Sequence, residues 1–377
     1  MKKINAASCA IFISVFSQQA WADRCDYEPN SGPVNKTVPL SVANISVGAD
    51  VPVGTTVHTL RVVGSAGLQP WLTCRTEGAS TKFAVDQYLN LSGTLTPDTG
   101  WTGVYAGAIY KTNIAGLSFA IVNNDGITNG KAITTTPTQK WTTPIGPGAY
   151  KFYYGNSFTI HFIKTGPMSS GSFNGASLPA VLLTTRSVTP VTGIPDTPYH
   201  INFSGTLNVI AATCVTPDVT VDMNKWDVSN WFNNGSKGTS TWRNFNLQLT
   251  GCPVFHGNYS DASSPPTYNT GDGFVAGKLV GNSLTVKFTP TYGAFDAANG
   301  IMKLDNSANS ATGVGIQIAS GTTSPTPINF NNTLNFPLTN NMGSTINLPF
   351  SARYIQTATR ATPGKANSKM MFTINYY

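Results

Sequence analysis

The chain has 377 residues, of which 36 are glycine, 24 are proline and only 10% are charged, and its formal net charge is +7. Threonine, serine, asparagine and valine are abundant and no amphipathic helix is evident, so the composition excludes a mainly helical fold and predicts an all-β protein of short strands and turns. The positive charges are scattered, without a basic run or stripe. That pattern argues against nucleic acid as a partner. The net positive charge favours an acidic glycan or a negatively charged cell surface, and the sparse, scattered positions of the charges count against that interpretation.

The segment 1–22 has the pattern of a secretory signal peptide. Lys2 and Lys3 precede a short apolar run at residues 11–16, and small residues flank Trp21 at the positions that signal peptidase reads. We expect cleavage before Asp23 and export of a soluble protein, because no later stretch has the roughly 20 apolar residues that a membrane helix needs. The remaining length suits two β-sandwich domains.

Four cysteines remain after this cleavage and permit three pairings. They form two well-separated groups, which favours one closed loop in each half of the chain, with Cys25 bonded to Cys74 and Cys214 bonded to Cys252. In an oxidising compartment each disulfide would stabilise its domain by roughly 4 kcal/mol in the chain-entropy model. There is no Cys-x-x-Cys motif and the histidines are isolated, so we expect neither a metal site nor a cofactor.

Alternating apolar residues predict a first domain at residues 23–187. Its expected strands are residues 60–63, 71–74, 117–121, 158–162 and 178–183. The Asn-Asn-Asp-Gly sequence at residues 123–126 predicts a hairpin turn that tolerates positive φ. An antiparallel β-sandwich is the natural result, with Trp71 in its core beside the disulfide.

The segment 188–200 contains three prolines and almost no core residues, which predicts a short, stiff linker. A second domain is then expected at residues 201–377. Its predicted strands include residues 205–214, 219–223, 245–249 and 284–288. The chain ends on a further strand whose inward positions are Met370, Phe372, Ile374 and Tyr376.

Several motifs of this second half resemble the subunits of chaperone-usher fimbriae. In the family's order they are GTLNV at 205–209 leading to Cys214, FNLQLTGCP at 245–253, GVGIQI at 313–318, LPFSARY at 348–354, PGKA at 363–366, and a tyrosine at the penultimate position. The first half resembles, less specifically, the receptor-binding domain of two-domain fimbrial tip adhesins. That likeness lies in the early cysteine, residues 45–54 before Cys74, and residues 158–183.

The resemblance implies that residues 201–377 form an incomplete immunoglobulin-like pilin fold that lacks its last strand. In that family a periplasmic chaperone, and later a strand donated by the adjacent fimbrial subunit, fills the groove beside the C-terminal strand; the outer-membrane usher is a further partner. By this likeness the groove residues are Met370, Phe372, Ile374 and Tyr376, and the chaperone holds the terminal carboxylate of Tyr377.

The start of the mature chain predicts its place in the fibre. Asp23 to Cys25 enter a folded domain without the alternating apolar extension that a shaft subunit donates. The chain should therefore accept a strand and donate none, which implies a position at the fimbrium tip, outside the cell, after export through the periplasm. The first domain is then the expected module for binding a host glycan or glycoprotein receptor.

Sugars bind by stacking their C–H faces on aromatic rings while polar side chains contact their hydroxyls. On this chemistry the candidate ligand-binding residues are Trp101, Tyr105, Asn123, Asn124, Asp125, Trp141, Tyr153 and Tyr154. Each alone is more often a core or sheet-surface residue, and Asn-Asn-Asp-Gly is common turn chemistry.

Two other functions stay open: a structural tip or minor pilin subunit, and an adhesin for an extracellular-matrix protein. We expect no enzyme, because the chain has no Gly-x-Ser-x-Gly elbow and residues 126–132 are too short for a phosphate-binding loop. A glycosidase would need two converging carboxylates, for which the sequence offers Glu77, Asp86, Asp98 and Asp125.

Overall fold

The structure is a computed structural model that describes residues 23–40, 44–64, 69–76, 83–187, 191–211, 213–233 and 238–377. The expected signal peptide, residues 188–190 of the expected linker, and Glu77 lie outside the described residues. The described chain is built of β-strands, with one short helix, α1 (Val228–Trp231), and the 3-10 turns η2 (Gly126–Thr128) and η3 (Gly175–Ser177), so the all-β prediction is confirmed. No helix in these ranges is long and apolar enough to cross a membrane.

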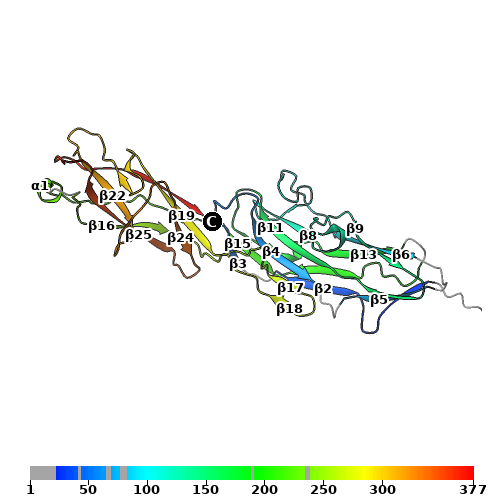
Figure 1. Cartoon of the computed structure of the whole chain (residues 1–377). Helices are drawn as coiled ribbons and strands as arrows, with labels where there is room; N and C mark the ends of the chain where they lie inside the picture. The colour runs from blue at the N-terminus through cyan, green and yellow to red at the C-terminus, as the bar shows by residue number, and fades with distance from the viewer. Residues whose placement is uncertain are drawn as a thin grey trace, which may run out of the picture.

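Two bodies placed end to end give the molecule an elongated shape (Figure 1). The first body consists of residues 23–210 and a later excursion at residues 257–281, and the second contains the other described residues from 213 onward. Each body encloses its own apolar core. The C-terminus lies where the two bodies meet (Figure 1).

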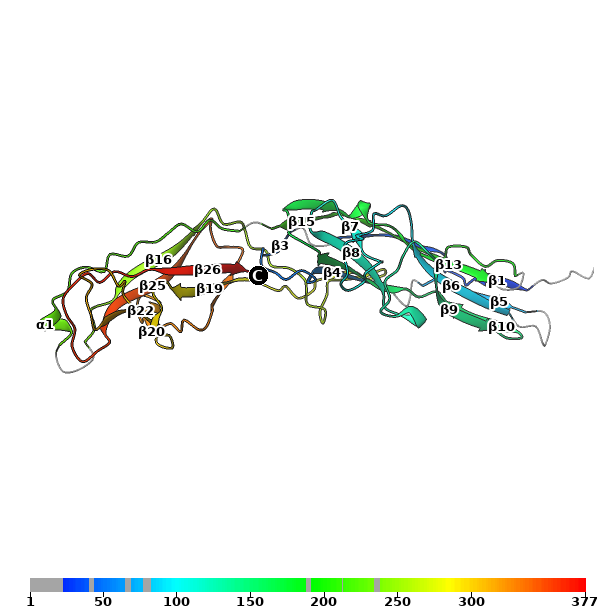
Figure 2. The same ribbon diagram turned by 90° about the horizontal axis from the view of Figure 1, so that it is seen from above.

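Four sheets form the first body, with strand orders β18-β17-β4-β11-β8-β7, β2-β14-β13-β6-β9, β1-β5-β10 and β12-β15-β3. The sheet of β1, β5 and β10 lies at the end far from the second body, whereas β3 and β15 lie near the junction (Figure 2). The strands are β1 (Arg24–Tyr27), β2 (Val34–Pro39), β3 (Asn44–Ser46), β4 (Thr56–Val63), β5 (Trp71–Arg75), β6 (Phe83–Leu91), β7 (Tyr110–Lys111), β8 (Leu117–Asn123), β9 (Thr138–Ile145), β10 (Ala149–Tyr153), β11 (Ser157–Lys164), β12 (Gly171–Asn174), β13 (Val181–Ser187), β14 (Tyr199–Ser204), β15 (Thr206–Ile210), β17 (Thr267–Asn269) and β18 (Gly273–Val275).

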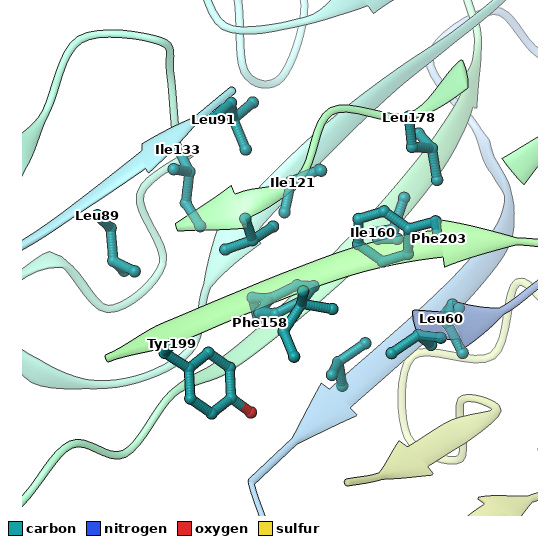
Figure 3. Packing of buried hydrophobic residues seen from close by; sticks show 14 of the residues in the cluster. Leu60, Leu89, Leu91, Ile121, Ile133, Phe158, Ile160, Leu178, Tyr199 and Phe203 are labelled. Carbon is teal, nitrogen blue, oxygen red and sulfur yellow. The ribbon is translucent and has the colours of Figure 1, made fainter. Parts of the chain in front are cut away.

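Strands with alternating apolar residues form the core of the first body. In β6 every second residue is buried and those between are half-buried, as expected for a strand with one face on the core. Strand β8 differs because both of its faces are buried. The connection between β6 and β7 covers its outer face, where Ile109 packs with Ala120 and Ile163. Figure 3 shows Phe158 and Ile160 of β11 among the other side chains of the core.

The expected linker at residues 188–200 is not a connection between the two bodies. Strands β13 and β14 are antiparallel neighbours, so the segment between them turns back within the first body. Thr192 bridges to Arg24 of β1, and the backbone of Cys25 donates to the Thr192 carbonyl over 2.9 Å. Pro195 and Pro198 therefore lie between two strands of the first body and not in a linker between the bodies.

Strands β14 and β15 also belong to the first body, although residues 201–377 were expected to form the second domain. Tyr199 and Phe203 of β14 lie inside the first core (Figure 3). Both strands make parallel pairs, β14 with β2 and β15 with β3, so the sheets are not purely antiparallel. The chain enters the second core only at Cys214.

Two sheets form the second body, with strand orders β16-β25-β22-β21-β20, where β23 also pairs with β22, and β24-β19-β26. The strands predicted at 245–249, 284–288 and the C-terminus are confirmed as β16, β19 and β26. Residues 219–223 form no strand. The bounds are β16 (Arg243–Thr250), β19 (Asn282–Pro290), β20 (Ala294–Asp296), β21 (Ile301–Met302), β22 (Val314–Ser320), β23 (Thr326–Pro327), β24 (Leu334–Leu338), β25 (Thr345–Gln356) and β26 (Met370–Tyr376).

The two predicted disulfides are confirmed. Cys25 is bonded to Cys74 across β1 and β5, and Cys214 is bonded to Cys252 beside β16. Each bond closes a loop within one body, as the grouping of the cysteines predicts.

The junction between the bodies is crossed more than once. After β16 the chain leaves the second core and returns to the first body, where β17 pairs in parallel with β4 and β18 pairs with β17. Tyr259 and Tyr268 of this excursion pack against the first core. Because several segments cross the junction, the two bodies are attached to each other by more than a single flexible connection.

Candidate functional sites

The C-terminal strand β26 is a sheet edge. It pairs with β19 on one side, and no strand in the described part of the chain pairs with its other side. Its side chains alternate as the sequence predicts, with Met371 and Thr373 exposed and Tyr376 buried. The inward residues Met370, Phe372 and Ile374 are only partly buried, so the core beneath this strand is incompletely covered.

A groove of about 790 Å³ runs beside this edge. Its floor includes Ile316 and Ile318 of β22, and Phe245 of β16 lies along it. Residues 218–224, which form no strand ladder in the described chain, also line the groove. A polypeptide placed in this groove would therefore meet both the unpaired edge of β26 and backbone that pairs with no strand.

The side chains of residues 219–223 suit the wall of such a groove. Val219 and Met223 are partly buried against the second core, whereas Thr220 and Asp222 between them are exposed. Alternation of this kind predicts a strand, and the strand is missing because the backbone lacks a ladder partner. The sequence therefore predicted the alternation of side chains at residues 219–223 correctly, but these residues do not pair with another strand.

The five groove residues expected from the sequence have different surroundings. Met370 and Phe372 line the groove. Ile374 packs against the core further along β26, and the buried Tyr376 ring lies parallel to Phe255 with ring centroids 6.5 Å apart. Tyr377 is 39% exposed and lies at the junction of the two bodies.

The eight candidate ligand-binding residues of the first body do not form one cluster. Trp101 and Tyr105 are partly buried in the loop that covers β8 and β11. The indole nitrogen of Trp101 donates to the Val104 carbonyl over 2.8 Å. The ring centroids of Tyr105 and His161 of β11 are 5.6 Å apart, so Tyr105 covers part of this histidine. Burial lowers the pKa of His161. These residues build the loop.

Asn123, Asn124 and Asp125 also have partners within the fold. Asn123 is buried and its amide donates to the hydroxyl of Thr128 over 2.8 Å. The Asn124 amide donates to Thr159 over 2.7 Å. Asn-Asn-Asp-Gly therefore serves mainly as turn chemistry, with Gly126 at a φ of 65°, although the turn is longer than the expected hairpin.

A buried lysine joins this turn to the neighbouring strands. Lys140 of β9 lies 2.9 Å from the Asp125 carboxylate and also donates to the Gly155 carbonyl. Burial lowers the pKa of Lys140, and the nearby Asp125 opposes that shift. Sequence reasoning missed this residue, although a lysine at an inward position of an alternating strand is a signal of a buried ion pair.

Trp141 follows on the exposed side of β9, and 48% of its surface is accessible. It lies beside η2, since a Cβ on Gly126 would be 3.4 Å from its ring. Of the candidate residues it is one of two that present a large aromatic surface to solvent, the other being Tyr153.

Tyr153 and Trp71 form an aromatic pair on the outer face of the β1-β5-β10 sheet. Tyr153 is 48% exposed and its ring centroid lies 4.7 Å from that of Trp71. Trp71 is partly exposed, so its expected place in the core is wrong, because its neighbours Leu72 and Cys74 take the inward positions of β5. The adjacent Tyr154 points inward, is fully buried, and burial raises the pKa of its hydroxyl.

Charged residues border this aromatic pair. The Lys151 ammonium lies 5.1 Å from the centre of the Trp71 ring and 3.1 Å from the Glu28 carboxylate. A hydrogen bond from Thr73, with the nearby Lys151, lowers the pKa of Glu28. Aromatic faces beside fixed polar groups are the chemistry that contacts a sugar ring.

Two carboxylates that the sequence offered for a glycosidase have hydrogen-bond partners within the fold. Asp86 accepts hydrogen bonds from Gln139 and Thr142, and Asp98 accepts one from Ser118. No three histidine, cysteine, aspartate or glutamate side chains of the described chain come together in a way that would hold a metal ion.

Comparison with known proteins gives one family match. Residues 201–377 match the family model described as fimbrial protein. This match begins where the second domain was expected to begin, although strand pairing places residues 201–210 in the first body. A search of curated protein sequences gave no match.

Solved structures give distant likenesses. The CupB6 tip adhesin of Pseudomonas aeruginosa is 16% identical, with 94% of this chain and 95% of that chain covered and a TM-score of 0.35. The receptor-binding domain of the adhesin MrkD1P of Klebsiella pneumoniae is 16% identical, with 51% and 98% covered and a TM-score of 0.29. The Csu pilus chaperone-tip subunit complex of Acinetobacter baumannii gives 12% identity, 93% and 99% coverage and a TM-score of 0.23. Likenesses this distant carry no argument about ligands.

Proposed function

Because residues 201–377 match the family model of fimbrial proteins, we propose that the chain is the adhesin at the tip of a chaperone-usher fimbria. Its second body accepts a strand from a neighbouring protein, and its first body binds a receptor on a host surface. A fimbrial domain is a structural and binding unit and not an enzyme, which agrees with the lack of a catalytic motif in the sequence.

One observation carries the strand-accepting part of this proposal. The groove of about 790 Å³ is lined by Met370 and Phe372 of the unpaired edge strand β26 and by residues 218–224, which form no strand, and apolar core residues that line it are only partly buried. An extended segment with alternating apolar residues would satisfy both backbone edges and bury that core. A periplasmic chaperone and then the adjacent subunit would supply it, and the usher would assemble the fibre.

Accessible aromatic residues favour a carbohydrate as the receptor. Tyr153, which packs on Trp71, and separately Trp141 are exposed. Their strands β5, β9 and β10 lie in the part of the first body remote from the second body (Figure 2). Beside the pair of Tyr153 and Trp71, Lys151 and Glu28 supply fixed polar groups for sugar hydroxyls. Of the eight candidates, Tyr153 and Trp141 are therefore the two that we assign to receptor contact.

The test compares whole fimbriae that carry single substitutions in the adhesin. Tyr153→Ala and Trp141→Ala should each lower binding to the preferred glycan of an array by about tenfold or more. Ile127→Ser, which changes an exposed residue without an aromatic ring, is the control. Saturable binding to collagen or fibronectin with no glycan bound would instead support a matrix-protein adhesin. Fimbriae that bind neither would support a structural tip subunit.

A further inference from the structure

The hydrogen-bond register of β26 determines which of its backbone groups face the open side of the strand. Tyr377 and Ser283 exchange both backbone hydrogen bonds, at 2.8 and 3.0 Å. In an antiparallel pair such residues alternate with residues whose N–H and C=O point to the other side. The backbone groups that face the open side of the strand are therefore those of Met370, Phe372, Ile374 and Tyr376.

At Tyr376, the last of these residues, the backbone groups on the open side are already hydrogen-bonded to the first body. The backbone N–H of Asp50 donates to the Tyr376 carbonyl over 3.1 Å, and the Tyr376 N–H donates to the Asp50 carboxylate over 2.8 Å. For Met370, Phe372 and Ile374, no such bond exists on the open side within the described residues. The open edge is thus three residues long, and Asp50 closes one end of it.

Residues 46–50, which we name the stop loop, are held firmly in this place. The buried Lys164 ammonium donates to the carbonyls of Ala49 at 2.7 Å and Gly48 at 3.3 Å. The Asn282 amide donates to the Ser46 carbonyl over 3.0 Å and to the Tyr377 carbonyl over 3.2 Å. The loop is therefore bonded to the first body and to the end of β26 together.

Gly48 shows how closely the stop loop approaches the strand. A Cβ at this position would lie 2.1 Å from the Tyr376 carbonyl oxygen, so no other residue fits without movement of the loop or the strand. The close contact between the stop loop and β26 therefore requires glycine at position 48 in addition to the hydrogen bonds.

We propose that the stop loop fixes the register of the strand that enters the groove. The partner is an extended segment with alternating apolar residues, and it pairs with Met370, Phe372 and Ile374 and ends against the first body beside Asp50. This inference rests on the proposed function, since it requires that a strand enters the groove. If the strand ends beside Asp50, the neighbouring protein contacts the first body as well as the groove of the second body.

The test measures amide hydrogen exchange, residue by residue, in the full mature chain with and without a synthetic peptide of alternating valine and threonine. In the free wild-type protein Tyr376 should be protected, whereas Phe372 and Ile374 exchange fast. The peptide should slow exchange at Phe372 and Ile374 and leave Tyr376 unchanged. In Asp50→Ala, Tyr376 should exchange about tenfold faster in the free chain, as expected for loss of one hydrogen bond, and the peptide should then protect it. Asp50→Asn keeps an acceptor oxygen and should behave as wild type.

The outcomes separate the two proposals. If the peptide protects no residue of β26 while Tyr376 is protected in the free chain, strand addition at this groove is wrong. If the peptide slows exchange at Tyr376 in the wild type, or if Tyr376 is unprotected in the free wild type, the stop loop does not set the register. Gly48→Ala provides a second variant, because it should expose Tyr376 without altering Asp50.

Discussion

The two bodies differ in how completely they bury their cores. All but one of the largest fully buried side chains lie in the first body, the exception being Phe350. In the second body several apolar side chains at the groove stay only partly buried, namely Val219, Met223, Phe245, Met370, Phe372 and Ile374. The first body is a closed sandwich whose strand β8 is covered on both faces, and the second has a core that is open along one edge. Burial thus separates a body whose core is covered from one whose core is uncovered along one edge, where we propose that a neighbouring protein adds a strand.

The largest expected effect comes from removing the edge itself. Deletion of residues 372–377 should abolish capture by the periplasmic chaperone and lead to degradation of the chain, because it removes most of the strand beside the groove. Affinity purification with the tagged chaperone measures the capture. Substitution of the exposed Met371 by threonine is the matched control and should leave capture intact. A truncated chain that remained a stable monomer would contradict the open-edge account.

A pair of large-to-small substitutions compares the two cores directly. Phe158→Ala in the closed core should lower the free energy of unfolding by about 3–5 kcal/mol, because its side chain is fully buried. Phe372→Ala should lower it less in the free chain, because that side chain is only partly buried. Urea unfolding, with and without the strand peptide, measures both. The cost of Phe372→Ala should rise when the peptide is bound, and an unchanged cost would argue against strand entry over this residue.

The two disulfides are expected to stabilise the two bodies by similar free energies. They close loops of 49 and 38 residues, so the chain-entropy model predicts about 4 kcal/mol of stabilisation from each. Replacing Cys25 and Cys74 together with serine should destabilise the first body, and the same change at Cys214 and Cys252 should destabilise the second. Separate unfolding transitions followed by calorimetry test this. A single shared shift from either change would mean that the two bodies unfold as one unit.

The smallest expected effect concerns pH and the first body. His58 of β4 is fully buried between Phe162 and Tyr259, and burial lowers its pKa from 6.5 to about 4. The unfolded chain therefore binds a proton below pH 6.5 that the folded chain takes up only near pH 4. Stability should fall as the pH drops through this window, by at most about 1.4 kcal/mol per pH unit.

His58→Leu removes the titrating group and should flatten this part of the stability profile. Urea unfolding at a series of pH values between 7 and 4, for the wild type and the variant, measures the difference. Parallel curves for the two proteins would show that His58 does not carry the effect.

Much of the architecture was accessible from the sequence. The all-β class, the two disulfides, and the alternation of the C-terminal strand follow from local composition and period, which report which face of a strand is buried. The proline-rich segment at 188–200 misled for a physical reason, since prolines stiffen a long turn within a domain as well as a linker between domains. Pairing between distant segments, such as β14 with β2 and β17 with β4, leaves no local signal.

The candidate ligand residues show the same limit. Exposed and buried aromatic residues look alike in a sequence, so Tyr153 and the fully buried Tyr154 were ranked together. Trp71 was expected in the core and instead pairs with Tyr153 at the surface, because the disulfide residue Cys74 sets which face of β5 is inward. The contact between Asp50 and Tyr376 could not be predicted from the sequence, because it depends on how the two bodies meet.

Thermal unfolding of the mature chain with and without the alternating strand peptide tests the central claim most directly. The account predicts that the transition of the second body lies below that of the first in the free chain, and that the peptide raises it by about 10 °C or more while leaving the first unchanged. A second body as stable as the first without any peptide, and unaffected when it is added, would contradict the account.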